Sequence, residues 1–342
     1  MTISDKPLVS VCIPCYNAEK SIAETLDSIL AQTYSNIEII VSDNQSNDAT
    51  REIVRGYASQ GVRLVENPPV KDGDGRIFGA FDNWDYALSQ GTGEFLCLYH
   101  ADDLYDPAIV EKEVSFMLAA PDAGSVLTLM RRVDENGNLL RNVKYRRGVV
   151  KLDDALFDFK SFLHAVMEHG HFVCTSSLMV RKKIYQQVGH FDENHFSTAA
   201  DLDYLMRLSR LNKIGVIYEQ LMGYRISKWH ASAQIDKGRI KLGDYFRVID
   251  HYIELLGLNK ISEQAMKMHT LHLQEDCIIC SWKALVIGNF DASKKMMLKA
   301  GGWRLSKKSF SSSFGAIVSC IALFVKVVFL FRLDRIVCRM KR

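Results

Sequence analysis

The chain has 342 residues, of which 48% are hydrophobic and 24% are charged, a composition typical of folded globular proteins. This composition excludes an intrinsically disordered chain and a protein that crosses the membrane many times, and the 21 glycines and 6 prolines exclude collagen-like or linker-like material. The length fits one large domain or two domains of ordinary size.

The formal net charge of +3 is unevenly distributed along the chain. Nine Lys or Arg and a single Asp fall within residues 304–342, so the rest of the chain is net acidic. Because a nucleic-acid-binding protein needs its positive charge on the folded body, this pattern excludes nucleic acid as an expected partner. A basic tail rich in apolar residues instead favours an anionic membrane surface.

The first 130 residues alternate short apolar runs with segments of helical periodicity. The predicted strands are 8–13, 37–41, 62–65 and 94–99, and the predicted helices are 21–31, 50–58, 82–89 and a helix beginning near Pro107. Such alternation predicts the α/β class, with a doubly wound, mostly parallel sheet and flanking helices. Ligands bind such sheets outside the carboxyl ends of the strands, where the acidic clusters at 43–48 and 102–103 fall.

The second half of the chain carries weaker signals. Residues 131–170 show one clear feature, a hairpin turn at 134–138. The later predictions are a strand at 172–180, a helix at 201–211, a strand at 214–218 and helical structure from 237 to 302. We therefore expect an α/β domain at 1–235, a helical C-terminal region at 236–308 and a membrane-associating tail at 309–342.

The tail is apolar first and amphipathic afterwards. Residues 314–331 contain one charge, Lys326, and are marginal in length for crossing a bilayer, which needs about 20 apolar residues. In the following residues, Leu333, Ile336, Val337 and Met340 share one helical face, and the opposite face is lined by arginines 332, 335, 339 and 342. This pattern favours a helix lying in the membrane interface. There are two alternatives. The first is a single membrane-spanning helix, and the second is a core or dimer helix capped by solvated arginines.

The candidate chemistry resides in three groups of carboxylates. Asp43 ends the second predicted strand, Asp102 and Asp103 end the fourth, and Asp201 and Asp203 begin a helix. Mg²⁺ and Mn²⁺ take oxygen ligands, typically one or two carboxylates together with substrate phosphates. The pair at 102–103 suits such a cation, although acidic residues at this place also often cap the next helix.

Several segments resemble the family 2 glycosyltransferases, which have the GT-A fold. Residues 9–17 (VSVCIPCYN), 28–34 (SILAQTY) and 38–50 (EIIVSDNQSNDAT) resemble the opening strands and loops of the family. Gly93-Glu94-Phe95-Leu96 leading to Ala101-Asp102-Asp103 resembles its DXD region, and residues 191–193, 201–203 and 207–208 resemble its acceptor-side motif. These pieces occur in the order of the family across roughly residues 8 to 230.

The resemblance implies an inverting transferase that uses a nucleotide-sugar donor, and it implies roles for individual residues. Asp43 would recognise the nucleobase of the donor, and the other nucleotide-binding candidates are Pro14, Tyr16, Asn17 and Ala101. Asp102 would hold the divalent cation, Mn²⁺ or Mg²⁺, and Asp201 would be the general base. Candidates on the donor and acceptor sides are Asp103, Arg76 and Asp203. The alternative for Asp203 is a salt bridge to Arg207, and the alternative for Arg76 is a solvated loop position. Asn83-Trp84 is expected to pack helix on sheet, with stacking on a ligand as the alternative.

Three positions depart from the family pattern. His100 stands where Asp is usual, Ala200 where Glu is common, and Ser227 where His is often found. Imidazole can bind Mn²⁺ or donate a hydrogen bond to phosphate, so His100 is a further candidate metal ligand. His230 is another candidate for the metal or the diphosphate.

The resemblance therefore implies a hexosyl or N-acetylhexosaminyl transferase. It would move a sugar, with a UDP-sugar as the expected donor, to a saccharide or lipid-linked acceptor of a surface polysaccharide. No secretory signal is visible, so we expect a cytoplasmic enzyme attached peripherally to the inner face of the cell membrane through its tail. The sequence does not determine the oligomeric state, and a homo-oligomer is one alternative. The alternatives are a catalytically silent relative that binds nucleotide sugars, a thiol oxidoreductase using Cys12 and Cys15, and a zinc site that adds Cys277 and Cys280.

Overall fold

A computed structural model of the chain describes residues 6–68, 79–140, 155–226, 238–301 and 313–330. The described residues form two compact units. The first contains the described residues up to 226 except 167–170, and the second contains 167–170 and the described residues from 238 onward. The boundaries that we expected at residues 235 and 308 lie outside the described residues.

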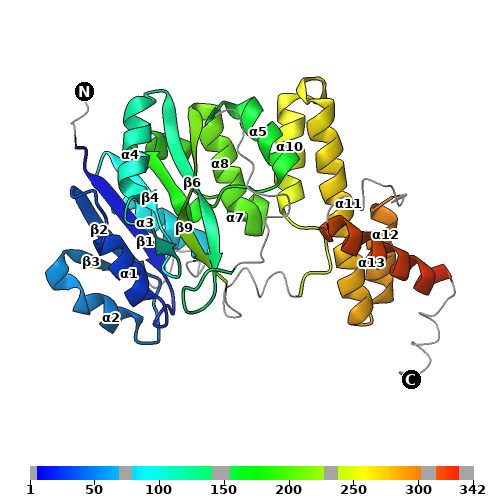
Figure 1. Cartoon of the computed structure of the whole chain (residues 1–342), viewed down its shortest axis with the longest axis horizontal. Coiled ribbons are helices and arrows are strands. Elements are labelled where there is room, and N and C mark those ends of the chain that lie inside the picture. Colours follow the sequence, from blue (N-terminus) through cyan, green and yellow to red (C-terminus); the bar gives the residue numbers. More distant parts are fainter. Residues whose placement is uncertain (1–5, 69–78, 141–154, 227–237, 302–312, 331–342) are drawn as a thin grey trace. The chain divides into compact units, whose positions relative to one another are not determined.

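The first unit is built on one mixed sheet (Figure 1). Its strands are β1 (Val9–Cys15), β2 (Ile37–Asp43), β3 (Val62–Glu66), β4 (Phe95–Leu98), β5 (Leu104–Tyr105), β6 (Ala123–Val133), β7 (Leu156–Phe157), β8 (Leu178–Arg181) and β9 (Lys213–Arg225). The order is β3-β2-β1-β4-β8-β6-β9-β5, with β7 also paired to β9. Strands β3, β2, β1 and β4 are parallel, as the sequence predicts, whereas β8 runs antiparallel to both β4 and β6.

Helices cover both faces of this sheet. Helices α1 (Ile22–Leu30), α2 (Thr50–Gly56) and α4 (Ile109–Ala119) share one apolar core with the alternate β1 residues Val9, Val11 and Ile13. Helices α3 (Ala80–Ser89), α6 (Lys182–Val188) and α8 (Ala200–Leu211) contribute nothing to that core and yet contact the same sheet. Because successive side chains of a strand point to opposite faces, these helices cover the other face.

The sequence did not reveal two elements, strand β6, which ends just inside the weakly patterned stretch 131–170, and helix α5 (Phe159–His169), which lies within it. The predicted hairpin turn is confirmed, since the Asp134 N–H donates to the Asn138 carbonyl at 2.9 Å and Gly137 has φ +78°. The strand predicted from residue 172 is wrong at its start. It begins only at Leu178, because Thr175–Ser177 forms a 3₁₀ turn, η2, in which the Ser177 hydroxyl binds the Cys174 carbonyl at 2.8 Å.

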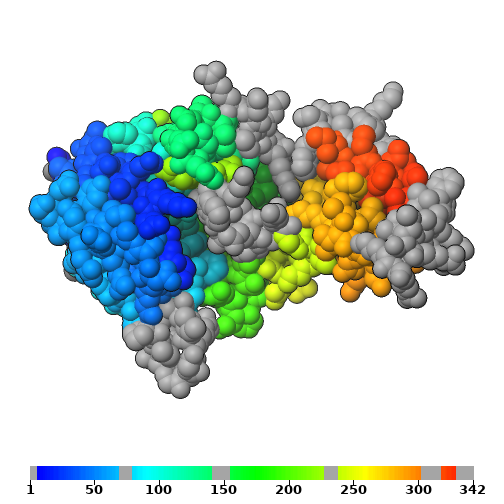
Figure 2. Space-filling model, turned by 90° about the horizontal axis from the view of Figure 1, so that it is seen from below, coloured from blue at the N-terminus to red at the C-terminus, as the bar shows by residue number. Residues whose placement is uncertain are grey.

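The second unit is helical. It contains α10 (Tyr245–Leu256), α11 (Glu263–Val286), α12 (Phe290–Lys299) and α13 (Ser313–Leu330). Helix α11 packs against α12 and α13 (Figure 1), and α13 forms part of the surface in Figure 2. None of the helices in the described ranges combines the length and the apolarity that a membrane crossing requires. The amphipathic pattern predicted at 331–342 lies outside the described residues.

The packing of β9 against α4 can be tested at Gly215. A Cβ atom at this position would lie 2.1 Å from Phe116 Cε1, so Gly215→Ala forces the strand and the helix apart. We expect the free energy of unfolding to fall by about 1–3 kcal/mol in urea unfolding. Gly56→Ala is the matched control, because nothing lies within 4 Å of its added Cβ, and we expect no loss of stability. Equal destabilisation by both variants would contradict this packing.

Candidate active site

The carboxyl ends of β1 and β2 lie side by side, with Cys15 in register with Asp43. The Asp43 carboxylate is fully buried, and it accepts hydrogen bonds from the Ser46 N–H at 2.9 Å and from the Cys15 thiol at 3.6 Å. The Ser46 hydroxyl in turn accepts from the Asn17 N–H at 2.8 Å. These bonds fix the two loops that follow the strands, including Asn17 at φ +49°.

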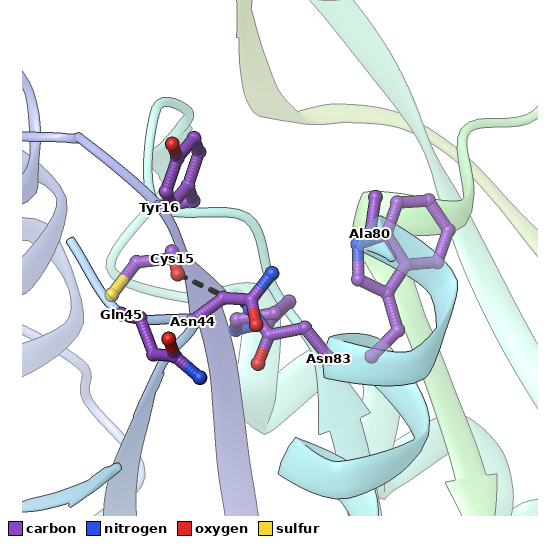
Figure 3. Close-up of a pocket in the computed structure, with 8 residues that line it drawn as sticks. Cys15, Tyr16, Asn44, Gln45, Ala80 and Asn83 are labelled. Atoms are coloured by element: carbon purple, nitrogen blue, oxygen red, sulfur yellow. Dashed lines mark hydrogen bonds between the residues drawn. The ribbon is translucent and has the colours of Figure 1, made fainter. Parts of the chain in front are cut away.

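A pocket of about 460 Å³ opens at this edge of the sheet, between the loops after β1 and β2 and the start of α3 (Figure 3). It is lined by Pro14, Cys15, Tyr16, Asn44, Gln45, Ala80, Asn83 and Trp84. The volume is within the range of small-molecule sites, roughly 300–1,000 Å³. The lining combines two aromatic rings with amide groups, which suits a ligand with a flat ring and several polar atoms.

The predicted nucleotide-binding residues take different positions around this pocket. Pro14 and Tyr16 line it, and the Tyr16 side chain is 59% exposed. Asn17 and Asp43 are not among the lining residues, and they hold the loops behind it. Ala101 is buried, and its carbonyl accepts hydrogen bonds at 3.0 Å from two hydroxyl groups of the α1 segment.

The other lining residues were not among the predicted nucleotide-binding residues. Asn44 and Gln45 directly follow β2, so their place after a parallel strand was the available signal. Asn83 and Trp84, for which packing of helix on sheet was expected and stacking on a ligand was the alternative, also line the pocket. The Asn83 amide donates to the Cys15 carbonyl at 3.2 Å, and the Trp84 ring centre lies 4.5 Å from that of His100.

His100, Asp102 and Asp103 follow β4 and form a group that could hold a cation, because one candidate ligand atom from each lies within 4.8 Å of the others. Asp103 is fully buried, which removes it from direct contact with an acceptor. Its Oδ1 accepts from the Arg225 N–H at 3.0 Å, and its Oδ2 has no hydrogen-bond partner among the described residues. Burial, followed by the charge of Asp102, raises the pKa of Asp103 well above its usual range. A divalent cation fits these residues because it would neutralise two adjacent carboxylates.

Arg225, at the end of β9, secures this loop and was given no role from the sequence. Its guanidinium is 4% exposed and donates from Nε to the Asp102 carbonyl at 2.9 Å. Its Nη2 binds Glu24 of α1 at 2.6 Å, and its Nη1 binds the Glu135 carbonyl of the hairpin turn. One side chain therefore ties the cation loop to α1 and to the hairpin.

Asp201 and Asp203 lie in the first turn of α8 with different surroundings. Asp201 is half-buried, and its Oδ1 accepts from the Leu202 N–H at 2.7 Å. Asp203 is 2% exposed and accepts from Arg207 Nε at 2.8 Å, which is the salt bridge considered as its alternative role. Arg207 also donates to the Val188 and His190 carbonyls, so this pair anchors the segment before α8.

The cation group and Asp201 share one region of the molecule. Burial first, and then the charges of Asp103 and Asp201, raise the pKa of the Cys174 thiol to about 12. Turn η2, which follows Cys174, contacts both β4, which precedes the cation group, and α8, which carries Asp201 in its first turn. Arg76, Ser227 and His230 lie outside the described residues.

The cysteine pairs show no features of a reactive thiol site. Cys12 and Cys15 lie three residues apart in β1, so their side chains point to opposite faces of the sheet. Burial raises the pKa of both thiols, whereas reactive cysteines have a lowered pKa. Burial also raises the pKa of Cys277 and Cys280 to about 11. In the described residues, the candidate cation group includes no cysteine.

The sequence profile of glycosyl transferase family 2 matches residues 10–189, more than half of the chain. The chain therefore belongs to this family and is a glycosyltransferase. Glycosyltransferase MJ1057 of Methanocaldococcus jannaschii, named as uncharacterized, is 29% identical over 252 residues, which cover 72% of this chain and 80% of that protein. The Escherichia coli UDP-Glc:alpha-D-GlcNAc-diphosphoundecaprenol beta-1,3-glucosyltransferase WfgD is 34% identical over 114 residues, which cover 33% of this chain and 42% of WfgD.

Solved structures support the fold. TarS 1–349 of S. aureus in complex with UDP has a TM-score of 0.52 at 18% identity, covering 94% of this chain and 91% of that one. The mannosyltransferase PcManGT of Pyrobaculum calidifontis in complex with GDP-Man and Mn²⁺ has a TM-score of 0.56 at 16% identity. This match covers 96% of this chain and 88% of PcManGT. The predicted fold class, a GT-A type sheet followed by a helical C-terminal region, is thereby confirmed.

Asp85 of α3 lies beside the pocket residue Trp84 and is itself buried. Its Oδ2 accepts from the Phe191 N–H at 3.1 Å and lies 3.3 Å from His190 Nδ1. Burial outweighs these contacts and raises the pKa of Asp85 to about 6. Because the folded-state pKa exceeds the unfolded value of about 4, the folded protein loses stability as the pH rises from about 4 to 6, and the loss persists above that range.

Asp85→Asn removes this ionisation and retains an acceptor for the Phe191 N–H. We compare the free energy of unfolding of the variant with that of the original chain at pH 4 and at pH 7.5. We expect this difference to shift in favour of the variant by about 1–3 kcal/mol as the pH rises from 4 to 7.5. The exposed His190 contact contributes little to the comparison. Urea unfolding of both proteins at the two pH values measures the effect. A stability difference that does not change with pH would show that the folded-state pKa is not raised.

Proposed function

We propose that this glycosyltransferase moves a sugar from a nucleotide-sugar donor, a UDP-sugar, to a hydroxyl group of a saccharide or lipid-linked acceptor, with inversion at the anomeric carbon. The observation that carries the proposal is the gathering of a pocket, a cation group and the start of α8 with Asp201 around the ends of the strands of one sheet. Open α/β sheets bind ligands outside the carboxyl ends of their strands.

The pocket lined by Tyr16, Asn44, Gln45, Asn83 and Trp84 takes the nucleotide in this proposal. Aromatic rings can stack on a base, and amide groups can pair with its polar edge. Asp43 contributes to binding of the nucleobase indirectly, because its carboxylate fixes the loop after β2 that lines the pocket. The choice of UDP draws support from the UDP-Glc in the name of WfgD and from the UDP complex of TarS.

Asp102, together with His100 and Asp103, would hold a divalent cation beside the donor diphosphate. Such a cation stabilises the charge that develops on the leaving diphosphate. Mn²⁺ draws support from the PcManGT complex and from the imidazole of His100, since nitrogen ligands suit Mn²⁺ better than Mg²⁺. Arg225 contributes by keeping the Asp102 backbone in place.

Asp201 is the general base of the proposed reaction. As the acceptor oxygen attacks the anomeric carbon, its proton passes to the Asp201 carboxylate. The bond from that carbon to the diphosphate oxygen breaks, and its electron pair leaves with the diphosphate. One displacement from the opposite face inverts the configuration, so no covalent sugar–enzyme intermediate is required.

We further propose that the enzyme works in surface polysaccharide synthesis at the cytoplasmic face of the cell membrane, attached peripherally. The diphosphoundecaprenol acceptor in the name of WfgD supports a membrane-bound acceptor. The basic and apolar composition of residues 304–342 supports the attachment. In this arrangement residues 1–235 carry the reaction, 236–308 form the helical region, and 309–342 contact the membrane.

Asp201→Asn tests the general base. The amide cannot accept the acceptor proton, so we expect sugar transfer to fall by roughly 10²–10⁴-fold while UDP affinity stays unchanged. Transfer from UDP-sugars in the presence of Mn²⁺ gives the rate, and isothermal titration gives the affinity. Asp122→Asn, at an exposed carboxylate, is the control. Transfer at the original rate by Asp201→Asn, or no turnover of any donor by the original chain, would contradict the proposal.

Arg225→Lys tests whether the guanidinium positions the cation loop. Lysine cannot reach the three acceptors of Arg225 together, so we expect the affinity for Mn²⁺ to fall by roughly 10–100-fold. Mn²⁺ titration followed by electron paramagnetic resonance measures it.

Arg181→Lys is the matched control for this experiment. Arg181 is another buried arginine, which donates to the Ala123 and Met117 carbonyls at 2.8 and 2.7 Å. We expect its replacement to lower the melting temperature without changing the Mn²⁺ affinity. Similar losses of Mn²⁺ affinity in both variants would refute a specific role for Arg225.

A further inference from the structure

Helix α13 is apolar on both of its long faces. The inner face, which includes Val318, Ala322, Val325 and Val328, is buried. Val318 and Ala322 belong to a core cluster with Cys277 and Ile278 of α11. Because this face is already packed on protein, α13 lies along the helical unit rather than standing apart from it.

The outer face of α13 is exposed and equally apolar. Ile317 is 58% exposed, Leu323 52% and Val327 36%. Phe324 is 53% exposed, although its ring also lies edge-on to Trp282 of α11. In a helix with 3.6 residues per turn, these positions fall on one continuous stripe, with the exposed Cys320 between them. A stripe of large apolar side chains in water marks a surface that a partner covers.

The charge of the surrounding chain identifies the partner. Lys326 is the single charged residue of α13, and the neighbouring helix α12 exposes three lysines, Lys294, Lys295 and Lys299, against one acid, Asp291. The sequence on either side of α13, residues 302–312 and 331–342, contains eight Lys or Arg and one Asp. Basic residues that flank an apolar helix in the sequence match the chemistry of a bilayer surface, which offers acyl chains beside anionic headgroups.

We propose that the outer face of α13, formed by Ile317, Leu323, Phe324 and Val327, inserts into the interface of an anionic lipid membrane with the helix in the plane of the bilayer. This deepens the peripheral attachment in the proposed function by naming its surface. It does not depend on the identity of the donor sugar or of the general base.

The test is flotation of the full chain with lipid vesicles. We expect the original protein to float with vesicles of phosphatidylcholine and phosphatidylglycerol, to float less with phosphatidylcholine alone, and to lose binding as salt is raised. Leu323→Glu places a charge in the stripe, and we expect its partition coefficient on anionic vesicles to fall at least about tenfold.

Leu258→Glu is the matched control, because Leu258 is 68% exposed in the same unit but lies outside α13, in the 3₁₀ turn η4 (Leu258–Lys260). We expect it to bind vesicles like the original chain. Circular dichroism checks that both variants are folded. Sugar transfer to a water-soluble acceptor, measured on the same preparations, is expected to be unchanged, so failed membrane binding is distinguishable from failed catalysis.

Three outcomes would overturn the proposal. In the first, the original chain does not bind anionic vesicles. In the second, Leu323→Glu and Leu258→Glu bind them equally well. In the third, light scattering shows a dimer that Leu323→Glu converts to a monomer, which would make the stripe an interface between two copies of the chain.

Discussion

Two adjacent carboxylates, Asp102 and Asp103, are held together at the end of β4, one of them fully buried, and the proposed chemistry depends on this concentration of negative charge. Like charges at such a distance repel strongly where water is excluded. Arg225 opposes this repulsion, because its N–H binds Asp103 and its guanidinium binds the Asp102 carbonyl. The loop is thereby preorganised for a cation, which would complete the neutralisation.

The sheet topology brings the other parts of the site to this loop. The parallel strands β1, β2 and β4 end at the same edge, so the pocket and the cation group are neighbours, and the contact of Trp84 with His100 links them. The antiparallel strand β8 then reverses the chain direction. The turn η2 before β8 contacts both β4, which precedes the cation group, and α8, which carries the proposed base Asp201.

Membrane attachment and catalysis use different parts of the chain in our proposals. The transfer chemistry resides in the first unit, and the apolar stripe resides on α13 of the second. A charged substitution on the stripe can therefore alter where the enzyme works without altering its reaction. An enzyme with a lipid-linked acceptor gains from this division, because confinement to a surface raises the local concentration of acceptor.

The sequence by itself determined the α/β class, the family, the strand ends that lie at Asp43 and before Asp102, and the helix start that carries Asp201, because periodicity and motif order are local properties of the chain. It did not reveal β6 or α5, whose places depend on pairing with segments far away in sequence. Only the tertiary structure showed that Trp84 lines the pocket and that Arg225 clamps the cation loop. Each of these depends on which distant backbone atoms come within hydrogen-bond or van der Waals range, and chain folding alone decides that.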